Sequence, residues 1–118
     1  MHDYTDYVGR YGHVAEKFAK MGYDFYGMDN RGHGKSEGRL AYFESIDQLV
    51  DDLTGYINKV FETFYSKMQG FSSVPPVFLI AHGQGALVVL NFLINNDHTI
   101  KSKESSLIKG VAFLKPFW

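Results

Sequence analysis

A short stretch in the second half of the chain constrains the fold most strongly. The apolar run 77–80 leads into the pentapeptide Ala-His-Gly-Gln-Gly at 81–85, and a second apolar run, 86–90, follows at once. A continuous apolar run is typical of a strand that is covered on both faces, and glycine accepts the positive φ of a sharp turn. The sequence therefore predicts a buried strand at 77–82, a tight turn, and a helix from that turn to about Ile94.

Four further segments have the periodicity of regular structure. Apolar residues recur at helical spacing over 13–21 and over 46–68. Segments 23–29 and 107–114 are short and largely apolar, as strands are. Helices that alternate with buried strands predict the α/β fold class, here a three-layer α/β/α domain with a mostly parallel sheet of about three strands and three helices. Because no internal repeat or linker divides the chain, we expect residues 1–118 to form a single domain.

Capping residues mark the ends of the predicted helices. Gly22 and Gly70 are placed to end the first and the second helix, because glycine readily adopts the left-handed conformation of a helix C-terminus. Ser45 and Gln48 form a capping box at the start of the second helix. Gly55 lies inside that helix, where glycine costs about 1 kcal/mol relative to alanine.

Composition limits what the chain can bind. Its 118 residues are 45% hydrophobic, and 12 Lys and Arg against 13 Asp and Glu leave a net charge of -1. This balance gives no electrostatic footprint for nucleic acid, and the lack of cysteine excludes disulfides and thiol chemistry. No signal peptide is visible, and no apolar run approaches the ~20 residues of a membrane span. We expect no transmembrane segment and a cytoplasmic location, with peripheral membrane association as the alternative.

Two glycine-containing turns are incomplete as nucleotide-binding motifs. A phosphate-binding loop that ends at 34–36 requires a glycine where Asp29 stands, and a dinucleotide fingerprint that starts at 83–85 requires one where Val88 stands. The five histidines also lack the paired spacing of a metal site; they are His2, His13, His33, His82 and His98. We therefore expect no metal and no organic cofactor.

Three segments, in their order and spacing, resemble one enzyme family. They are Gly9-Arg10-Tyr11, Met28-Asp29-Asn30-Arg31-Gly32-His33-Gly34-Lys35-Ser36-Glu37-Gly38 and Val77-Phe78-Leu79-Ile80-Ala81-His82-Gly83-Gln84-Gly85. Together they are similar to the N-terminal half of the monoacylglycerol lipase branch of the α/β-hydrolases, also described as serine aminopeptidase S33-like. The likeness covers essentially the whole chain and implies a partial α/β-hydrolase fold. Within it, a structural turn would be formed by Arg31, Gly32, His33, Gly34 and Ser36.

The turn that holds the nucleophile is the clearest departure from this family. There the family reads Gly-x-Ser-x-Gly, with the serine on a strained bend between a strand and a helix. By resemblance, Ala81 replaces the first glycine, Gly83 stands at the serine position between His82 and Gln84, and Gly85 is the last glycine. Glycine keeps the shape of the bend but cannot attack a carbonyl, and loss of the nucleophile costs about 10⁶ in kcat. The resemblance therefore implies that no catalytic site is intact.

The resemblance also assigns the oxyanion hole. Its two donors would be the backbone N–H groups of Gln84 and Tyr4. His2 and Asp3 lie where the family has His-Gly, so that Asp3 is a second departure. Because Asp3 has a side chain where the family has glycine, we do not expect the close backbone approach that the family uses at this turn.

Other parts of the family's machinery would lie outside residues 1–118. The triad Asp and His and the lid follow residues 115–118 in the family, and a central strand precedes Met1. We therefore expect an incomplete domain, in which segments 23–29 and 77–82 pair directly or a partner chain supplies the missing strand. His33, His82 and His98 are the candidates for a base that would replace the missing triad histidine. We do not expect such a substitute triad, because it would also need a nucleophile.

The resemblance implies a serine hydrolase that acts on carboxylic esters of the monoacylglycerol or lysophospholipid type, through an acyl-enzyme. Because Gly83 replaces the serine and the triad Asp and His are absent, we expect this chain to be catalytically dead. One alternative is a non-catalytic binding module for a lipid or ester ligand, or an interaction module that self-associates through an open sheet edge. The other is a truncated or degenerate gene product.

Overall fold

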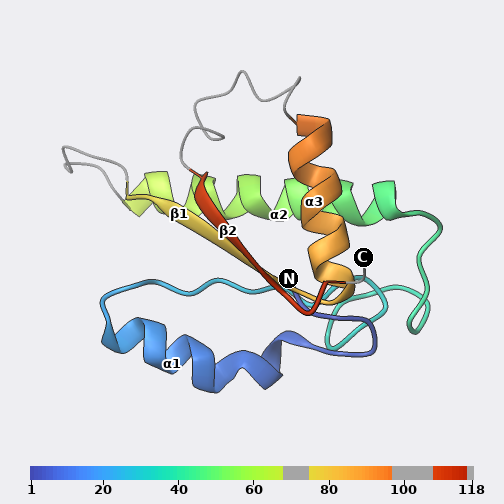
Figure 1. The fold of residues 1–118 in the computed structure, drawn as a ribbon, viewed down its shortest axis with the longest axis horizontal. Coiled ribbons are helices and arrows are strands. Elements are labelled where there is room, and N and C mark those ends of the chain that lie inside the picture. The colour runs from blue at the N-terminus through green and yellow to red at the C-terminus, as the bar shows by residue number, and fades with distance from the viewer. Residues whose placement is uncertain (68–74, 97–107, 117–118) are drawn as a thin grey trace.

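The computed structural model describes residues 1–67, 75–96 and 108–116 as an α/β arrangement (Figure 1). Its elements are the 3-10 helix η1 (Val8–Tyr11), α1 (Gly12–Lys20), α2 (Ile46–Lys67), β1 (Val77–His82), α3 (Gln84–Asn96) and β2 (Ile108–Leu114). In Figure 1, α1 lies on the opposite side of the two strands from α3. The predicted fold class is confirmed.

The sheet has two parallel strands. β1 pairs with β2 from Val77 opposite Ile108 to His82 opposite Leu114, and α3 connects them in sequence, which makes a βαβ unit. Side chains from α2, α3 and β1 form the core beside this sheet. Its buried members are Leu49, Val50, Leu53, Ala81, Ala86, Val88, Val89 and Phe92.

The prediction of a strand at 23–29 is wrong. The sheet therefore has two strands among the described residues, where three were expected. Residues 23–29 have no regular structure. Phe18 of α1 holds the segment by packing against the rings of Tyr23 and Phe25, at centroid distances of 5.9 and 6.1 Å. The Tyr56 hydroxyl of α2 donates to the Gly27 carbonyl at 2.9 Å. An apolar segment becomes a strand only where a neighbour completes its hydrogen-bond ladder, and no strand lies beside 23–29 in the part of the chain that the structure describes.

The expected direct pairing of 23–29 with 77–82 is therefore wrong as well. The edge of β1 that faces away from β2 instead contacts the first residue of the chain. The amino group of Met1 donates to the Ile80 carbonyl at 2.6 Å, and the His82 N–H donates to the Met1 carbonyl at 3.0 Å. This pair of bonds is the pattern of a parallel bridge, and it fixes the residues that follow Met1 beside the turn after β1.

Most helix ends agree with the capping signals. Gly22 ends the turn after α1 with a φ of 86°, and the Gln48 N–H at the start of α2 donates to Ser45 Oγ at 3.2 Å. Gly70, the predicted stop of the second helix, lies outside the described residues. No helix among the described residues has the length and apolarity to cross a membrane.

Replacing Gly55 with alanine should stabilise the protein. A Cβ at Gly55 would have no atom within 4 Å, and the residue lies exposed inside α2. We expect Gly55→Ala to raise the free energy of unfolding by about 0.5–1 kcal/mol, because alanine loses less backbone entropy than glycine in a helix. Urea denaturation followed by circular dichroism measures this, and an unchanged or lower stability would contradict the exposed helical placement of Gly55.

Candidate functional site: the turn between β1 and α3

The turn after β1 has the geometry of a strand-to-helix elbow. Gly83 lies between His82, the last residue of β1, and Gln84, the first residue of α3, with a φ of 54°. The Gly83 N–H donates to the Leu114 carbonyl at 3.0 Å, which ties the turn to β2. This left-handed conformation strains any residue other than glycine.

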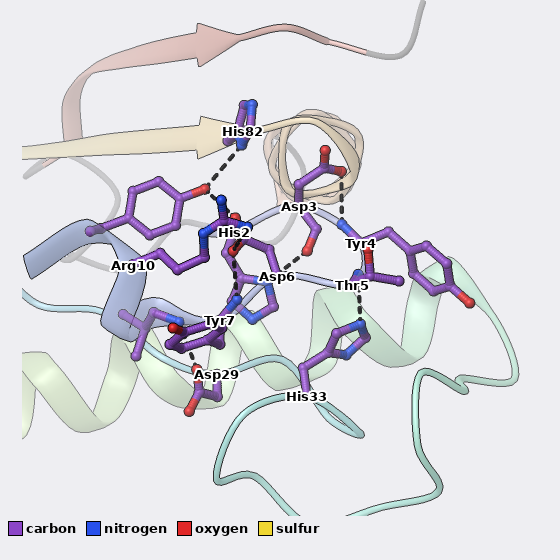
Figure 2. Close-up of polar contacts among 12 residues, drawn as sticks. His2, Asp3, Tyr4, Thr5, Asp6, Tyr7, Arg10, Asp29, His33 and His82 are labelled. Carbon is purple, nitrogen blue, oxygen red and sulfur yellow. Dashed lines mark hydrogen bonds and ion pairs between the residues drawn. The ribbon is translucent and has the colours of Figure 1, made fainter.

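The carboxylate of Asp3 fills the space where a side chain at position 83 would lie. A Cβ built on Gly83 would overlap Cγ, Oδ1 and Oδ2 of Asp3. Figure 2 shows Asp3 beside the end of α3, with its carboxylate toward the helix. A serine at 83 and the observed position of Asp3 therefore exclude each other.

Two backbone N–H groups converge on one oxygen of this carboxylate. Gln84 N–H donates to Asp3 Oδ1 at 2.8 Å and Tyr4 N–H donates to the same atom at 2.7 Å. These are the two groups that the sequence resemblance assigns to an oxyanion hole, and the structure brings them together. Their role toward a substrate stays a prediction. In the observed state the pair binds the chain's own carboxylate.

Buried His2 holds the loop that carries Asp3. Its Nδ1 lies 2.7 Å from the Asp3 carbonyl oxygen, and its Nε2 accepts the Asn30 N–H at 2.9 Å. Since a carbonyl only accepts, Nδ1 carries the proton and the ring is neutral. Burial lowers the pKa of His2 and outweighs the opposing hydrogen bond to Asp3. His2 is thus a positioning residue for Asp3.

His33 holds the same loop from the other side. Its Nδ1 lies 2.9 Å from the Arg31 carbonyl oxygen and its Nε2 accepts the Thr5 N–H at 3.2 Å (Figure 2). The Tyr4 ring packs edge-on against it, with centroids 5.7 Å apart. With both nitrogens engaged, His33 has no free lone pair with which to act as the substitute base considered above.

The turn 31–38 is fixed by charged side chains on either side of it. Arg31 makes a bidentate pair with Asp52 of α2 at 2.6 and 2.7 Å. The Asp29 carboxylate accepts N–H groups from Val8 at 2.7 Å and from Lys35 at 2.9 Å. Burial would raise the pKa of Asp29, but these donors outweigh it and lower the pKa. Ser36 Oγ donates to the Asp29 carbonyl at 2.6 Å.

Two glycines of this turn are required by close contacts. Gly32 has a φ of 70°, and a Cβ there would overlap the Arg39 carbonyl oxygen. At Gly34 a Cβ would overlap the carboxylate of Asp29. These close contacts fix the turn, and the turn holds His33 against the loop that carries Asp3.

A second polar network joins His82 to the N-terminal segment. The Tyr11 hydroxyl donates to Asp6 Oδ2 at 2.7 Å, so it must accept from His82 Nδ1 at 3.0 Å. Burial and the Asp6 hydrogen bond raise the pKa of Tyr11. Arg10 lies 3.4 Å from the other oxygen of Asp6. Tyr11 belongs to the Gly9-Arg10-Tyr11 motif, but the sequence did not predict this network. His98, the third candidate base, lies outside the described residues.

Among the described residues, no three His, Cys, Asp or Glu side chains are grouped as metal ligands would be. Most polar groups of the site instead bond to one another, although the buried Asn30 Oδ1 and Gln84 Oε1 have no hydrogen-bond partner in the described part of the chain. Its chemistry is that of two N–H donors that hold a carboxylate beside a glycine.

The stability of the protein should fall as the pH is lowered from 8 to 6. Burial lowers the pKa of the Met1 amino group from 8.0 to about 6 and lowers that of His2 from 6.5. In this range the unfolded chain binds more protons than the folded chain, so stability rises with pH, and the Met1 share is about 1–3 kcal/mol. The pKa values of Asp6 and Asp29 are lowered from 3.8, so these two carboxyl groups change the stability only at lower pH.

Urea unfolding at pH 8, 7 and 6 tests this dependence, and N-terminal acetylation isolates the contribution of His2. A stability that stays constant or rises toward pH 6 would contradict the buried, neutral state of both groups.

Comparison with known proteins places the elbow in a family context. The chain matches the family described as "Serine aminopeptidase, S33" over residues 1–107. It is 29% identical over 91 residues to a monoacylglycerol lipase of Mycolicibacterium smegmatis, covering 77% of this chain and 30% of that protein. It is 32% identical over 111 residues to a probable lysophospholipase L2 of Haemophilus influenzae, covering 91% and 33%.

A monoglyceride lipase homolog of Monkeypox virus is 29% identical over 97 residues, covering 82% of this chain and 32% of the viral protein. The chain therefore spans about a third of the length of these curated relatives. No solved structure gives a significant match.

Proposed function

The chain belongs to the serine aminopeptidase S33 family of α/β-hydrolases, and from that premise we propose that its elbow is a catalytically silent form of a lipase-type active site. The relatives named as monoacylglycerol lipase and lysophospholipase support esters of glycerol and of lysophospholipids as the ancestral substrate class. The reaction of that class requires a nucleophile at position 83.

The occupation of the elbow by Asp3 carries this proposal. Gly83 has no hydroxyl, and the space above it holds the Asp3 carboxylate. The donors that would stabilise an oxyanion are already bonded to Asp3 Oδ1. A hydrolase without its nucleophile loses about 10⁶ in kcat, and blocked oxyanion donors remove a further ~10² or more.

Covalent labelling tests the proposal directly. We expect no adduct between the unmodified chain and a fluorophosphonate probe, and no turnover of a p-nitrophenyl ester above the buffer rate. A catalytically active relative, such as the Mycolicibacterium smegmatis lipase, serves as the positive control. An adduct located by mass spectrometry near residue 83, or turnover by the purified chain, would overturn the proposal.

An interaction role is the second candidate, and the free edge of β1 favours it. Beyond the bridge to Met1, no described residue pairs with this edge. Phe78 lies two residues before Ile80, so its backbone N–H and C=O groups point toward the same edge as the Ile80 carbonyl. The side chain of Phe78 is 53% exposed. An unpaired edge recruits further strands, and a second copy of the chain is the proposed partner.

Light scattering on a size-exclusion column tests self-association, with Phe78→Lys as the variant that places a charge at the edge. We expect a concentration-dependent dimer that this variant abolishes. A chain that stays monomeric at high concentration would exclude the interaction role.

A further inference from the structure

We infer that the N–H groups of Tyr4 and Gln84, together with the open face of Gly83, form a binding site for a carboxylate group, and that Asp3 fills this carboxylate site from within the chain. The inference rests on the proposed silent elbow and goes beyond it by naming the ligand class. It also gives Asp3 the role of a permanent occupant.

The donors come from two separate segments and meet at one atom. Tyr4 lies in the N-terminal loop and Gln84 begins α3, 81 positions away from Asp3 in sequence. Both N–H···O distances, 2.7 and 2.8 Å, are in the range of charge-assisted hydrogen bonds. The N-terminus of α3 adds the favourable end of a helix dipole. A single carboxylate oxygen therefore meets two aligned donors and a positive field.

Gly83 provides the room for the rest of the carboxylate. The atoms that a Cβ at 83 would overlap are Cγ, Oδ1 and Oδ2 of Asp3, which are the whole carboxylate group. With glycine at this position the helix has no capping side chain of its own. Asp3 supplies that cap from another loop.

The site does not depend on the Asp3 side chain for its shape. The backbone on either side of Asp3 is held by His2, which bonds to Asn30, and by Thr5, which bonds to His33. The Asp6 N–H donates to the Asp3 carbonyl at 3.3 Å, which closes the turn. Truncating the side chain should leave the donors in place and vacant for a small carboxylate from solution.

The test is rescue of Asp3→Ala by acetate. This variant should lower the melting temperature by about 5–15 °C, because two charge-assisted bonds are lost, one of which caps α3. Sodium acetate at about 0.5 M should recover roughly half of that loss through binding to the folded state. The amide resonances of Tyr4 and Gln84 should shift together and saturate during the titration. Sodium chloride at equal ionic strength should do neither.

Two controls keep the inference open to refutation. The unmodified chain should show no acetate-dependent shift at Tyr4 or Gln84, because its site is filled. Asp3→Asn keeps the volume and one acceptor oxygen, so it should fold and move both amide proton resonances upfield, which reports the shared acceptor even if Asp3→Ala fails to fold.

The carboxylate site would be overturned if acetate had no effect on a folded Asp3→Ala variant. It would also be overturned if only one or neither of the Tyr4 and Gln84 amide resonances moved in Asp3→Asn. Because neither readout is an activity, such a failure would leave the silent elbow standing. Ester turnover would refute the silent elbow in turn.

Discussion

Gly83→Ser alone should lower the free energy of unfolding by about 2–4 kcal/mol. The new Cβ would overlap the Asp3 carboxylate, so that either the side chain of Asp3 leaves its two N–H donors or the loop moves away. Loss of those bonds and forced repacking each cost about 1–3 kcal/mol, and the positive φ at 83 adds strain for any residue with a Cβ.

A double-mutant cycle measures the coupling of the two positions. Asp3→Ala and Asp3→Ala/Gly83→Ser complete the cycle with Gly83→Ser, and urea unfolding gives each stability. We expect the double variant to be more stable than the sum of the single changes predicts, by about 1–3 kcal/mol. Additive effects would show that the Asp3 carboxylate does not occupy the space above residue 83.

Gly85→Ala should be at least as damaging, with a loss of about 2–4 kcal/mol. A Cβ at Gly85 would lie 2.5 Å from the Met1 carbonyl oxygen and 2.7 Å from the His2 carbonyl oxygen. Both are backbone atoms, which cannot move aside as the end of a side chain can. The substitution would separate the N-terminal segment from α3 and break the parallel bridge to β1.

Whether Gly85→Ala lowers or raises the stability shows whether the N-terminal residues pack on α3. Gly85 is the second residue of α3, where helix propensity alone favours alanine by up to about 1 kcal/mol. Gly55→Ala is the matched control, because the same propensity acts there with no atom in the way. A gain of stability at both positions by chemical denaturation would mean that residues 1 and 2 do not pack on α3.

The helices and strand β1 could be predicted because their signals are local. The apolar run at 77–80 and the helical stripe of α2 each carry their periodicity within one segment, and β1 and α2 were found where expected. Segment 23–29 carried a strand-like composition, but strand formation is decided by a neighbour distant in sequence. Without such a neighbour, the segment packs through Phe18 and Tyr56 in place of a ladder.

The shape of the candidate site was also predictable, but its occupant was not. Glycines at the elbow predicted a positive φ, which Gly83 has. Asp3 was recognised only as a departure from the family pattern. That its carboxylate reaches Gly83 depends on the path of the chain between them, and a one-dimensional pattern does not contain that path. The paired departures at 3 and 83 were the available signal, because together they exchange one side chain for another across the same space.

The contact between Asp3 and Gly83 also makes the residues at these two positions depend on each other. A serine at 83 beside the aspartate introduces a collision, and removal of the aspartate beside glycine leaves α3 without its cap. Either single substitution should therefore give a less stable fold than the chain that carries both Asp3 and Gly83. A serine at 83 should be tolerated only when the Asp3 side chain is replaced as well, so we expect positions 3 and 83 to change together in related sequences.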